Sequence, residues 1–216
     1  ENMKIVAIVP IKMNNQRLPG KNTKMLGNKP LIQYILNTLK QVKEIDDIYV
    51  YCSNEEIKRY IKNDVKFLKR SEELDRDTTN FTQIFEAFSE KIDADIYVYT
   101  HATAPFISKE TIEDCITRVV RNGHDSAFTA EKIQDFLWMN NKPVNFDQSN
   151  IPRSQDLPLV YRETSGAYVF KKDMFEKYKS RVGMTPYIKE VFGKEKIDIN
   201  YQEDFDLAEK ILKEEY

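Results

Sequence analysis

Residues 4–34 read KIVAIVPIKMNNQRLPGKNTKMLGNKPLIQY, and this stretch decides the fold class. Residues 5–9 are almost wholly apolar and rich in β-branched side chains, which is typical of a buried strand in a parallel sheet. Pro10 is expected to end that strand. Pro30 opens a predicted helix, because apolar residues follow it at helical spacing: Leu31, Ile32, Ile35, Leu36 and Leu39.

The loop between this strand and this helix is cationic. From Lys12 to Lys24 it carries four basic side chains and no acid. A loop at the carboxyl edge of a sheet is where open α/β folds bind ligands, and its amides and cationic side chains suit a polyphosphate. A solvated surface loop is the alternative, but the absence of acids favours a site. Neither a G-x-G-x-x-G pattern nor a Walker pattern is present.

The rest of the chain alternates short apolar runs with amphipathic segments. Strands are predicted at residues 47–52, 65–68, 95–99, 125–130, 166–170 and 196–200, and helices begin near residues 53, 81, 108 and 203. This rhythm predicts a single α/β domain over residues 1–216 with a mainly parallel sheet. Residues 131–160 interrupt it with three prolines, the only Trp and no helical period, which indicates a functional or interaction element.

Composition excludes several classes of protein. A net charge of −2 offers no footprint for nucleic acid. No apolar run approaches the ~20 residues that span a bilayer, and the first residues lack the pattern of a signal peptide. Cys52 and Cys115 are far apart and fall in predicted regular elements, so we expect reduced thiols in a cytoplasmic protein.

The segments PIKMNNQRLPGKN and LGNKPLIQY together resemble the opening signature of the acylneuraminate cytidylyltransferase family. Its members activate sialic acid and related nine-carbon acid sugars as CMP conjugates, and the enzymes that make CMP-Kdo are similar in pattern. The segments THATAPF, YRETSGAY and IDIN extend the resemblance over nearly the whole chain. It implies a Rossmann-like, glycosyltransferase-A-type nucleotidyltransferase fold that uses CTP, an acid sugar and Mg²⁺. It also implies a homodimer whose subunits pair through an arm at about 131–160.

The resemblance also implies roles for individual residues. Those implied as catalytic are Lys21, Arg17 and Asp198, and Lys12 would join Arg17 and Lys21 on the triphosphate. The implied nucleotide-binding residues are Lys12, Asn14, Asn22, Arg70, Asp77, Thr78 and Thr79. The implied sugar-binding residues are His101, Thr103, Arg153, Arg162 and Ser165, with the arginines at the sugar carboxylate. The metal-site positions are Asp198 and Asn200, with Asp204 as a fallback ligand.

Three positions depart from the family pattern. His101 stands where the family has a sugar-contacting Gln, Ser165 where it more often has Asn, and Asn200 where it has a second Asp. The spacing between Arg162 and the Gly-Ala pair is one residue longer than in the family. Taken alone, His101 is equally consistent with a structural loop histidine, and an isolated Arg is more often a solvated surface charge.

Two other functions fit the same pattern. The acceptor could be another sugar, such as Kdo or a sugar 1-phosphate, because one fold hosts many activities. The replacement of an expected Asp by Asn200 also fits a catalytically silent nucleotide-binding protein. Sugar-dependent release of pyrophosphate from CTP separates the enzymes from the silent protein.

Overall fold

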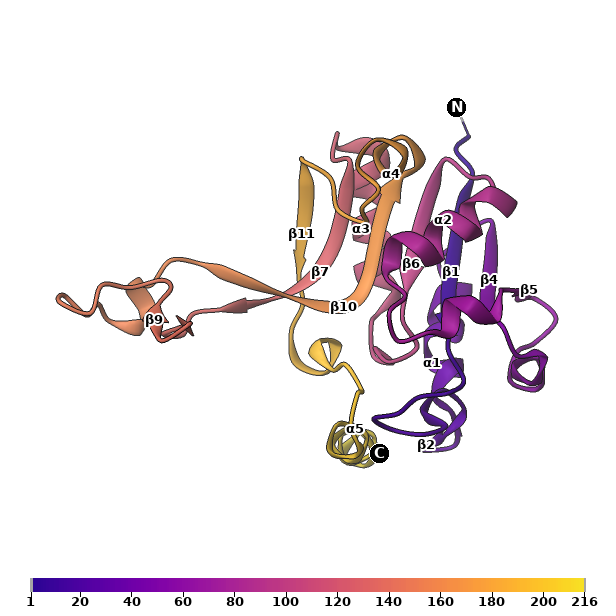
Figure 1. Cartoon of the computed structure of the whole chain (residues 1–216), viewed down its shortest axis with the longest axis horizontal. Helices are drawn as coiled ribbons and strands as arrows, with labels where there is room; N and C mark the ends of the chain where they lie inside the picture. Colours follow the sequence, from indigo (N-terminus) through magenta and orange to yellow (C-terminus); the bar gives the residue numbers. More distant parts are fainter. Residues whose placement is uncertain (1, 216) are drawn as a thin grey trace.

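The computed structural model describes residues 2–215, and its centre is a seven-stranded sheet (Figure 1). The strand order across the sheet is β11-β7-β10-β6-β1-β4-β5. Its strands are β1 (Ile5–Ile11), β4 (Asp47–Cys52), β5 (Lys66–Lys69), β6 (Ile96–Thr100), β7 (Ser126–Ile133), β10 (Val160–Lys171) and β11 (Pro186–Glu190). Neighbouring strands are parallel except where β10 pairs with β6 and β7. The predicted mainly parallel α/β fold is confirmed.

Helices and small sheets complete the described chain. The α-helices are α1 (Leu31–Lys40), α2 (Phe81–Lys91), α3 (Lys109–Arg121), α4 (Lys172–Tyr178) and α5 (Gln202–Glu214). The 3₁₀ helices are η1 (Lys21–Thr23), η2 (Glu55–Tyr60), η3 (Glu72–Asp75), η4 (Ser154–Asp156) and η5 (Gly193–Lys196). Two small antiparallel pairs join β2 (Met25–Leu26) to β3 (Lys29–Pro30), and β8 (Trp138–Met139) to β9 (Lys142–Pro143). Within residues 2–215, none of the helices combines the length and apolar character needed to cross a bilayer.

Helices cover both faces of the sheet because each carries one apolar stripe. The stripes of α1 and α3 pack on one face. On the other face, Phe85 and Phe88 of α2 meet Phe175 of α4. Phe85 is fully buried, and its ring stands edge-on to Tyr97 and Phe175 with centroids 4.7 and 4.5 Å away. Full burial of such a side chain contributes roughly 1.5–3 kcal/mol, so these aromatic contacts hold the layers together.

The strand order creates a switch point beside β1. The chain passes from β1 to β4 on one side, and β6 later pairs with β1 on the other side. Loops that follow two such strands diverge and leave a crevice at the carboxyl edge of the sheet. Three of the predicted site loops leave this edge, beginning after Ile11, Lys69 and Thr100. The fold therefore gathers segments that are far apart in the sequence.

The prediction of a strand at residues 196–200 was wrong. Lys196 ends η5, and residues 197–200 have no regular structure. Ile199 is fully buried in a cluster with Leu31 and Phe205, and its N–H donates to the carbonyl oxygen of Thr103 at 2.7 Å. The apolar alternation therefore reflects burial between α1 and α5. The seventh strand is β11, whose sequence PYIKE is largely half-exposed at a sheet edge and gave no alternating signal.

Several element boundaries also differ from expectation. The helix expected after residue 53 is the 3₁₀ helix η2, as is common in short connections, and the Asn54 side chain accepts the Glu56 N–H at 2.9 Å. β1 continues through Pro10 to Ile11, because pairing with β6 already ends at Ile8 and the missing N–H lies beyond it. The strands predicted at 65–68, 125–130 and 166–170 are β5, β7 and β10, of which β7 and β10 extend further into the arm.

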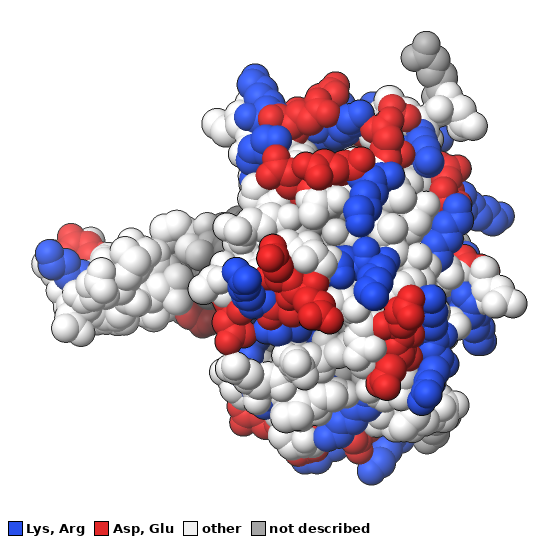
Figure 2. Space-filling model, turned by 45° about the vertical axis from the view of Figure 1, so that its right-hand side comes forward, with Lys and Arg blue, Asp and Glu red and all other residues white. Residues whose placement is uncertain are grey.

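The arm, defined as residues 131–160, projects from the sheet as expected (Figure 1). The paired ends of β7 and β10 form its base, where Val160 lies opposite Ile133. Further out, the ring of Phe146 contacts Phe136 and Trp138 with centroids 5.0 and 5.5 Å apart. Figure 2 shows a projection that is mostly free of acidic and basic side chains. A protruding surface of this kind is unusual unless something covers it.

Candidate active site

The phosphate loop, defined as residues 12–24, folds back on itself before any ligand binds. The side-chain amides of Asn15 and Asn22 both donate to the Lys12 carbonyl oxygen, at 2.8 and 3.0 Å. Gly20 has a φ of 67°, a left-handed conformation that glycine adopts without strain. These local bonds bury Asn22 and Lys21, which are 5% and 8% exposed. The loop is therefore a built structure rather than a solvated connection.

Lys21 belongs to this loop and has a perturbed pKa. Burial lowers its pKa, and the nearby Arg17 guanidinium acts in the same direction. The carboxylates of Asp198 and Asp204 partly oppose this shift. Two cations held close together, with one of them buried, form a site that an anion stabilises. This arrangement suits the negative oxygens of a triphosphate.

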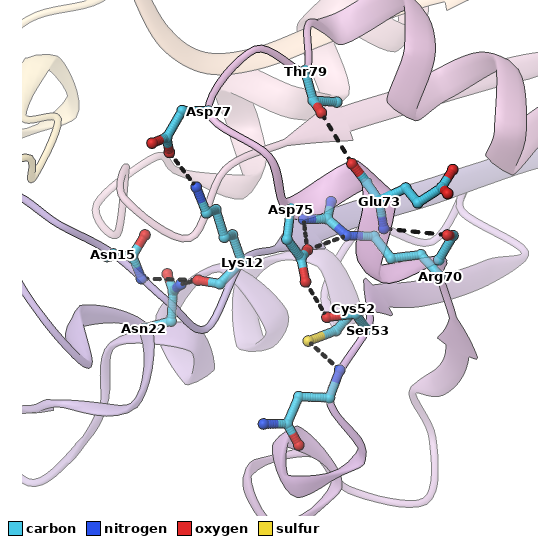
Figure 3. A network of polar contacts seen from close by, with 12 residues as sticks. Lys12, Asn15, Asn22, Cys52, Ser53, Arg70, Glu73, Asp75, Asp77 and Thr79 are labelled. Carbon is cyan, nitrogen blue, oxygen red and sulfur yellow. Dashed lines mark hydrogen bonds and ion pairs between the residues drawn. The ribbon is translucent and has the colours of Figure 1, made fainter.

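The Arg70 loop, defined as residues 70–79, closes over the phosphate loop (Figure 3). Lys12 forms an ion pair with Asp77 at 2.8 Å, and Gln16 also donates to Asp77. The hydrogen bond and charge of Lys12 lower the pKa of Asp77. The two loops line a cavity of about 470 Å³ in which Asn14 is exposed. Three of the predicted nucleotide-binding residues, Lys12, Asn14 and Asp77, thus line one cavity.

Arg70 is buried behind this pair of loops. Its side chain is 2% exposed and binds Asp75 through two nitrogens, at 2.7 and 3.2 Å. Ser53 donates to the other oxygen of Asp75, so Asp75 lies between the two residues (Figure 3). Breaking a buried pair of this kind is costly, because the remaining charge loses its partner. Arg70 is thus fixed in place before a nucleotide arrives.

Asn200 links the phosphate loop to the C-terminal segment that carries Asp198. Arg17 Nη2 donates to Asn200 Oδ1 at 3.0 Å, and Asn200 Nδ2 donates to Asp198 Oδ2 at 2.9 Å. Asp204 accepts the backbone N–H groups of Asn200 and Tyr201, at 3.0 and 2.8 Å. The three residues predicted at the metal site therefore lie together, facing the cationic loop.

His101 follows β6 at the same sheet edge. It lines a cavity of about 300 Å³ together with Lys12, Arg70, Asp77 and Thr79. Its ring is partly exposed, but its Nδ1 is buried and has no hydrogen-bond partner within residues 2–215. Burial lowers the pKa of His101 to about 4, and the Arg181 charge acts in the same direction. The His101 imidazole is thus neutral near pH 7, with its Nδ1 turned into the protein interior.

Ser165 lies in an irregular part of β10. Between Glu163 and Tyr168, β10 advances five residues while its partner β7 advances from Ala130 to Phe128. Ser165 has a φ of 58°, a left-handed conformation in which Asn is enriched among non-glycine residues. The bulge leaves β10 residues before the Gly-Ala pair unpaired, since a bulge adds residues to one strand of a pair.

Gly166 is required by this bulge. A Cβ atom at Gly166 would lie 2.6 Å from Ile107 Cδ1 and 2.9 Å from Thr129 Oγ1. Thr129 Oγ1 also binds the Thr164 hydroxyl at 2.9 Å and accepts the Ala167 N–H at 3.1 Å. The backbone of Ser165 therefore stands in a fixed place beside His101.

Arg162 lies at the base of the arm, near the metal-site residues. Two of its guanidinium nitrogens bind Glu131 Oε2, at 2.7 and 3.1 Å, and Lys196 binds the other oxygen at 3.2 Å. Arg162 lines a cavity of about 560 Å³ together with Asp198 and Asn200. Part of its wall is apolar, because Leu207 of α5 is 51% exposed there.

Four predicted site residues remain to be placed: Arg153, Thr78, Thr79 and Thr103. Arg153 is on the arm, where it binds its neighbour Asp156 at 2.7 Å, and we find no contact between it and the central cluster among the described residues. Thr78 is exposed beside Asp77, and Thr79 donates to the Glu73 carbonyl oxygen at 3.4 Å. Thr103 holds the Ile199 backbone and so anchors the segment that carries Asp198.

Sequence reasoning missed Arg181 near His101 and Asp75 beside Arg70. The Arg181 guanidinium lies 4.2 Å from the ring centroid of the buried Tyr168, and it pairs with Glu163 at 3.3 Å. The Tyr168 hydroxyl donates to the same Glu163 oxygen at 3.0 Å. Arg181 follows a run of lysines that all read as surface charge, so the sequence carries no signal that distinguishes it. Asp75, the partner of Arg70, was likewise one acid among several in its loop.

The side chains around Asp198 provide few ligands for a metal ion. Within residues 2–215, no cluster of three or more His, Cys, Asp or Glu side chains is placed to hold an ion. Asp198 is the carboxylate that faces the phosphate loop, since Asp204 is occupied by backbone N–H groups. A single carboxylate fits Mg²⁺, which keeps several waters and relies on substrate phosphates.

Comparison with known proteins identifies the family of this chain. The profile of the cytidylyltransferase family matches residues 6–216. The chain is 23% identical to the N-acylneuraminate cytidylyltransferase of Oncorhynchus mykiss over 97% of its own length and 50% of that protein. It is 26% identical to a pseudaminic acid cytidylyltransferase of Campylobacter jejuni, over 78% of each chain. The chain thus spans about half the length of the first of these curated relatives.

A solved structure shares the fold. The CMP:2-keto-3-deoxy-manno-octonic acid synthetase complexed with CTP superimposes with a TM-score of 0.74 at 16% identity, over 99% of this chain and all of the other. At this identity the likeness concerns the fold alone. The match of the family profile to almost every residue is broader, and it shows that the chain belongs to the cytidylyltransferase family.

Proposed function

We propose that the chain transfers CMP from CTP to a nine-carbon 2-keto-3-deoxy acid sugar of the sialic, legionaminic or pseudaminic type, and releases pyrophosphate. The observation that carries the proposal is the convergence of Arg17, Lys21 and Asp198 at the sheet edge. Family membership supports CTP as the nucleotide. The relatives that act on N-acylneuraminate and pseudaminic acid support the sugar class.

In this reaction the anomeric hydroxyl oxygen forms a bond to the α-phosphorus of CTP. The bond from that phosphorus to the pyrophosphate oxygen breaks, and the hydroxyl proton is released. Such chemistry needs positioning and charge neutralisation more than covalent help from the protein. We assign the triphosphate to Lys12, Arg17 and Lys21, which the phosphate loop holds within one cationic surface.

The nucleoside half of CTP is assigned to the cavity between the two loops. Asn14 and Asn22 of the phosphate loop and Arg70, Thr78 and Thr79 of the Arg70 loop frame the base and ribose in this proposal. Asp77 holds Lys12 across the entrance, so nucleotide entry requires that pair to separate. The pair is surface-exposed and worth less than about 1 kcal/mol, which makes such opening inexpensive.

We further propose that Mg²⁺ binds at Asp198. The ion would offset charge on the α- and β-phosphates. Asn200 lies beside it, but its side-chain oxygen would have to release Arg17 before it could join the metal. The hydrogen bond from Asn200 Nδ2 keeps the Asp198 carboxylate facing the cleft.

The sugar is assigned to the space bounded by His101, Ser165 and the arm base. Thr103 supports the Asp198 segment, and Arg162 is close enough to the metal-site residues to bind the sugar carboxylate. The half-exposed Leu207 in the same cavity offers an apolar surface for an acyl methyl group. This surface favours an acylated nonulosonic acid over Kdo, which carries no acyl group and is the alternative acceptor.

We propose that two copies of the chain pair through the arm. Large apolar side chains are exposed along it: Phe136, Trp138, Met139, Val144, Ile151 and Leu159. Pairing would cover them and would carry Arg153 toward the sugar site of the partner copy. Sedimentation of the wild type and of Trp138→Asp tests this point, and a monomeric wild type would refute it.

The test of the proposed function is release of pyrophosphate from each nucleoside triphosphate with Mg²⁺ and a panel of acid sugars. We expect release that requires CTP and a nine-carbon sugar together. Equal release with Kdo would favour the alternative acceptor. No release with any sugar would identify a silent nucleotide-binding protein and would overturn the proposal.

A further inference from the structure

Asn200 links two charged residues from opposite ends of the chain. Its Oδ1 accepts from Arg17 and its Nδ2 donates to Asp198, at 3.0 and 2.9 Å. Arg17 can only donate and an ionised Asp198 can only accept, so the orientation of the amide is determined by its neighbours. An amide can satisfy both partners at once, one at each of its two polar atoms, without adding charge.

The backbone around Asn200 is held equally firmly. Its N–H donates to Asp204 Oδ2, which also accepts the Tyr201 N–H at the start of α5. The Arg17 guanidinium lies over the Tyr201 ring, 5.3 Å from its centroid. A cation over an aromatic face is attracted by the ring, so Arg17 has a second contact to this segment. Asn200 is therefore the centre of a small network rather than an exposed substitute for a lost ligand.

We propose that Asn200 is a positioning residue, which aligns Arg17 and Asp198 before nucleotide and metal bind. This inference rests on the proposed function, in which Arg17 meets the triphosphate. The link uses one nitrogen of Arg17 and one oxygen of Asp198. The remaining guanidinium N–H groups and Asp198 Oδ1 stay available for phosphate and cation.

The neutrality of Asn200 is the essential property. The Arg17 guanidinium now donates to a neutral amide oxygen, whereas an Asp at this position would form a full ion pair with it and would hold it more strongly. It would also place a second carboxylate against Asp198, and two like charges stay together more easily when a cation lies between them. An Asp would thus strengthen cation binding while withdrawing Arg17 from the triphosphate. Asn200 instead leaves Arg17 available to the triphosphate, at the expense of weaker cation binding.

The test compares Asn200→Asp and Asn200→Ala with a matched control, Asn63→Asp. Asn63 is exposed just before the amino end of β5, at the opposite sheet edge. Mn²⁺ binding to the nucleotide-free protein is measured by electron paramagnetic resonance, and CTP binding in EDTA by calorimetry. We expect Asn200→Asp to bind Mn²⁺ about tenfold more tightly and metal-free CTP several-fold more weakly. Asn200→Ala should weaken metal-free CTP binding without tightening Mn²⁺, and Asn63→Asp should change neither.

Two results would overturn the inference. One is Mn²⁺ binding by Asn200→Asp that equals the wild type, and the other is wild-type CTP affinity of Asn200→Ala in EDTA. Circular dichroism of each variant establishes that it is folded. Failure of the proposed function is distinguishable, because it appears as a wild type that releases no pyrophosphate with any acid sugar. The Mn²⁺ titrations need no turnover and decide the role of Asn200 separately.

Discussion

The two halves of the cleft differ in how completely the chain satisfies its own polar groups. On the nucleotide side, Lys12 is paired with Asp77 and the buried Arg70 with Asp75. On the sugar side, His101 keeps a buried nitrogen without a partner within residues 2–215. Residues of the nucleotide side constrain one another, so we expect few substitutions to be tolerated there. The sugar side also carries two of the three departures from the family pattern, at His101 and Ser165.

The largest effect is expected where the two halves meet. Asp198→Ala should abolish pyrophosphate release, because it removes the carboxylate that faces the phosphate loop. The expected loss is 10³-fold or more, beyond the 10²–10³-fold for one electrostatic contact to a transition state. The assay is run with millimolar Mg²⁺ and again in EDTA, where the wild type should also be inactive. Asp173→Ala, at an exposed position of α4, is the control. Full activity in EDTA would remove the metal from this account.

The next effect tests the nucleotide half alone. Lys21→Ala should lower turnover by roughly 10²-fold, the cost of losing one charge contact to the transition state. The fold should persist, because Lys21 belongs to a short 3₁₀ turn outside the sheet. Initial rates are compared with Lys43→Ala, an exposed lysine beyond α1. Near-normal activity of Lys21→Ala would contradict the assignment of the phosphate loop.

A stability measurement addresses the sugar half without any substrate. Gly166→Ala places a Cβ 2.6 Å from Ile107 Cδ1, so the packing must shift. Overpacking of this kind typically costs about 1–3 kcal/mol in the free energy of unfolding. Denaturant unfolding measures it, with Gly123→Ala as a contrast, because a Cβ at Gly123 meets no atom within 4 Å and is strained only by its φ of 78°. Equal stability of Gly166→Ala and the wild type would show that the bulge is not tightly packed.

The smallest predicted effect concerns pH. The folded-state pKa of His101 is about 4, below its unfolded value of about 6.5, so the unfolded chain binds more protons between these values. Stability therefore falls as the pH drops from about 6.5 toward 4. His101→Gln removes this term, so the wild type should lose on the order of 1 kcal/mol more than the variant between pH 7 and pH 5. Parallel pH losses in both proteins would show that His101 titrates normally.

Local patterns in the sequence were sufficient for the framework of the fold. The strand at residues 5–9, the Pro30 helix start and the stripe of α2 were predictable, because apolar spacing and turn residues act over a few positions. The β11 edge strand was not predictable, since half-exposed edge residues carry no alternation. The burial of Ile199 imitated a strand because it packs between two helices distant in sequence.

The candidate site, like the fold, was predictable from the sequence only in part. The cationic phosphate loop was visible as a run of basic residues without acids. The bond from Arg17 to Asn200 joins positions 183 residues apart, and no spacing rule predicts it. Arg181 on Tyr168 was hidden for the same reason. Contacts between residues that are distant in the sequence determine the geometry of the site, and local sequence patterns do not show them.

The most direct test of the contrast between the halves is the specificity constant for several sugars with CTP as the fixed nucleotide. The sugars are N-acetylneuraminic acid, a legionaminic-type acid, a pseudaminic-type acid and Kdo, each tested with the wild type, His101→Gln and the control His124→Gln. We expect the wild type to prefer a modified nonulosonic acid over N-acetylneuraminic acid by ten- to hundredfold, since a polar group left unpaired costs about 1–3 kcal/mol. His101→Gln should narrow that preference with an unchanged KM for CTP, and His124→Gln should leave it intact. A wild type that prefers N-acetylneuraminic acid, with the same ranking in His101→Gln, would contradict the account.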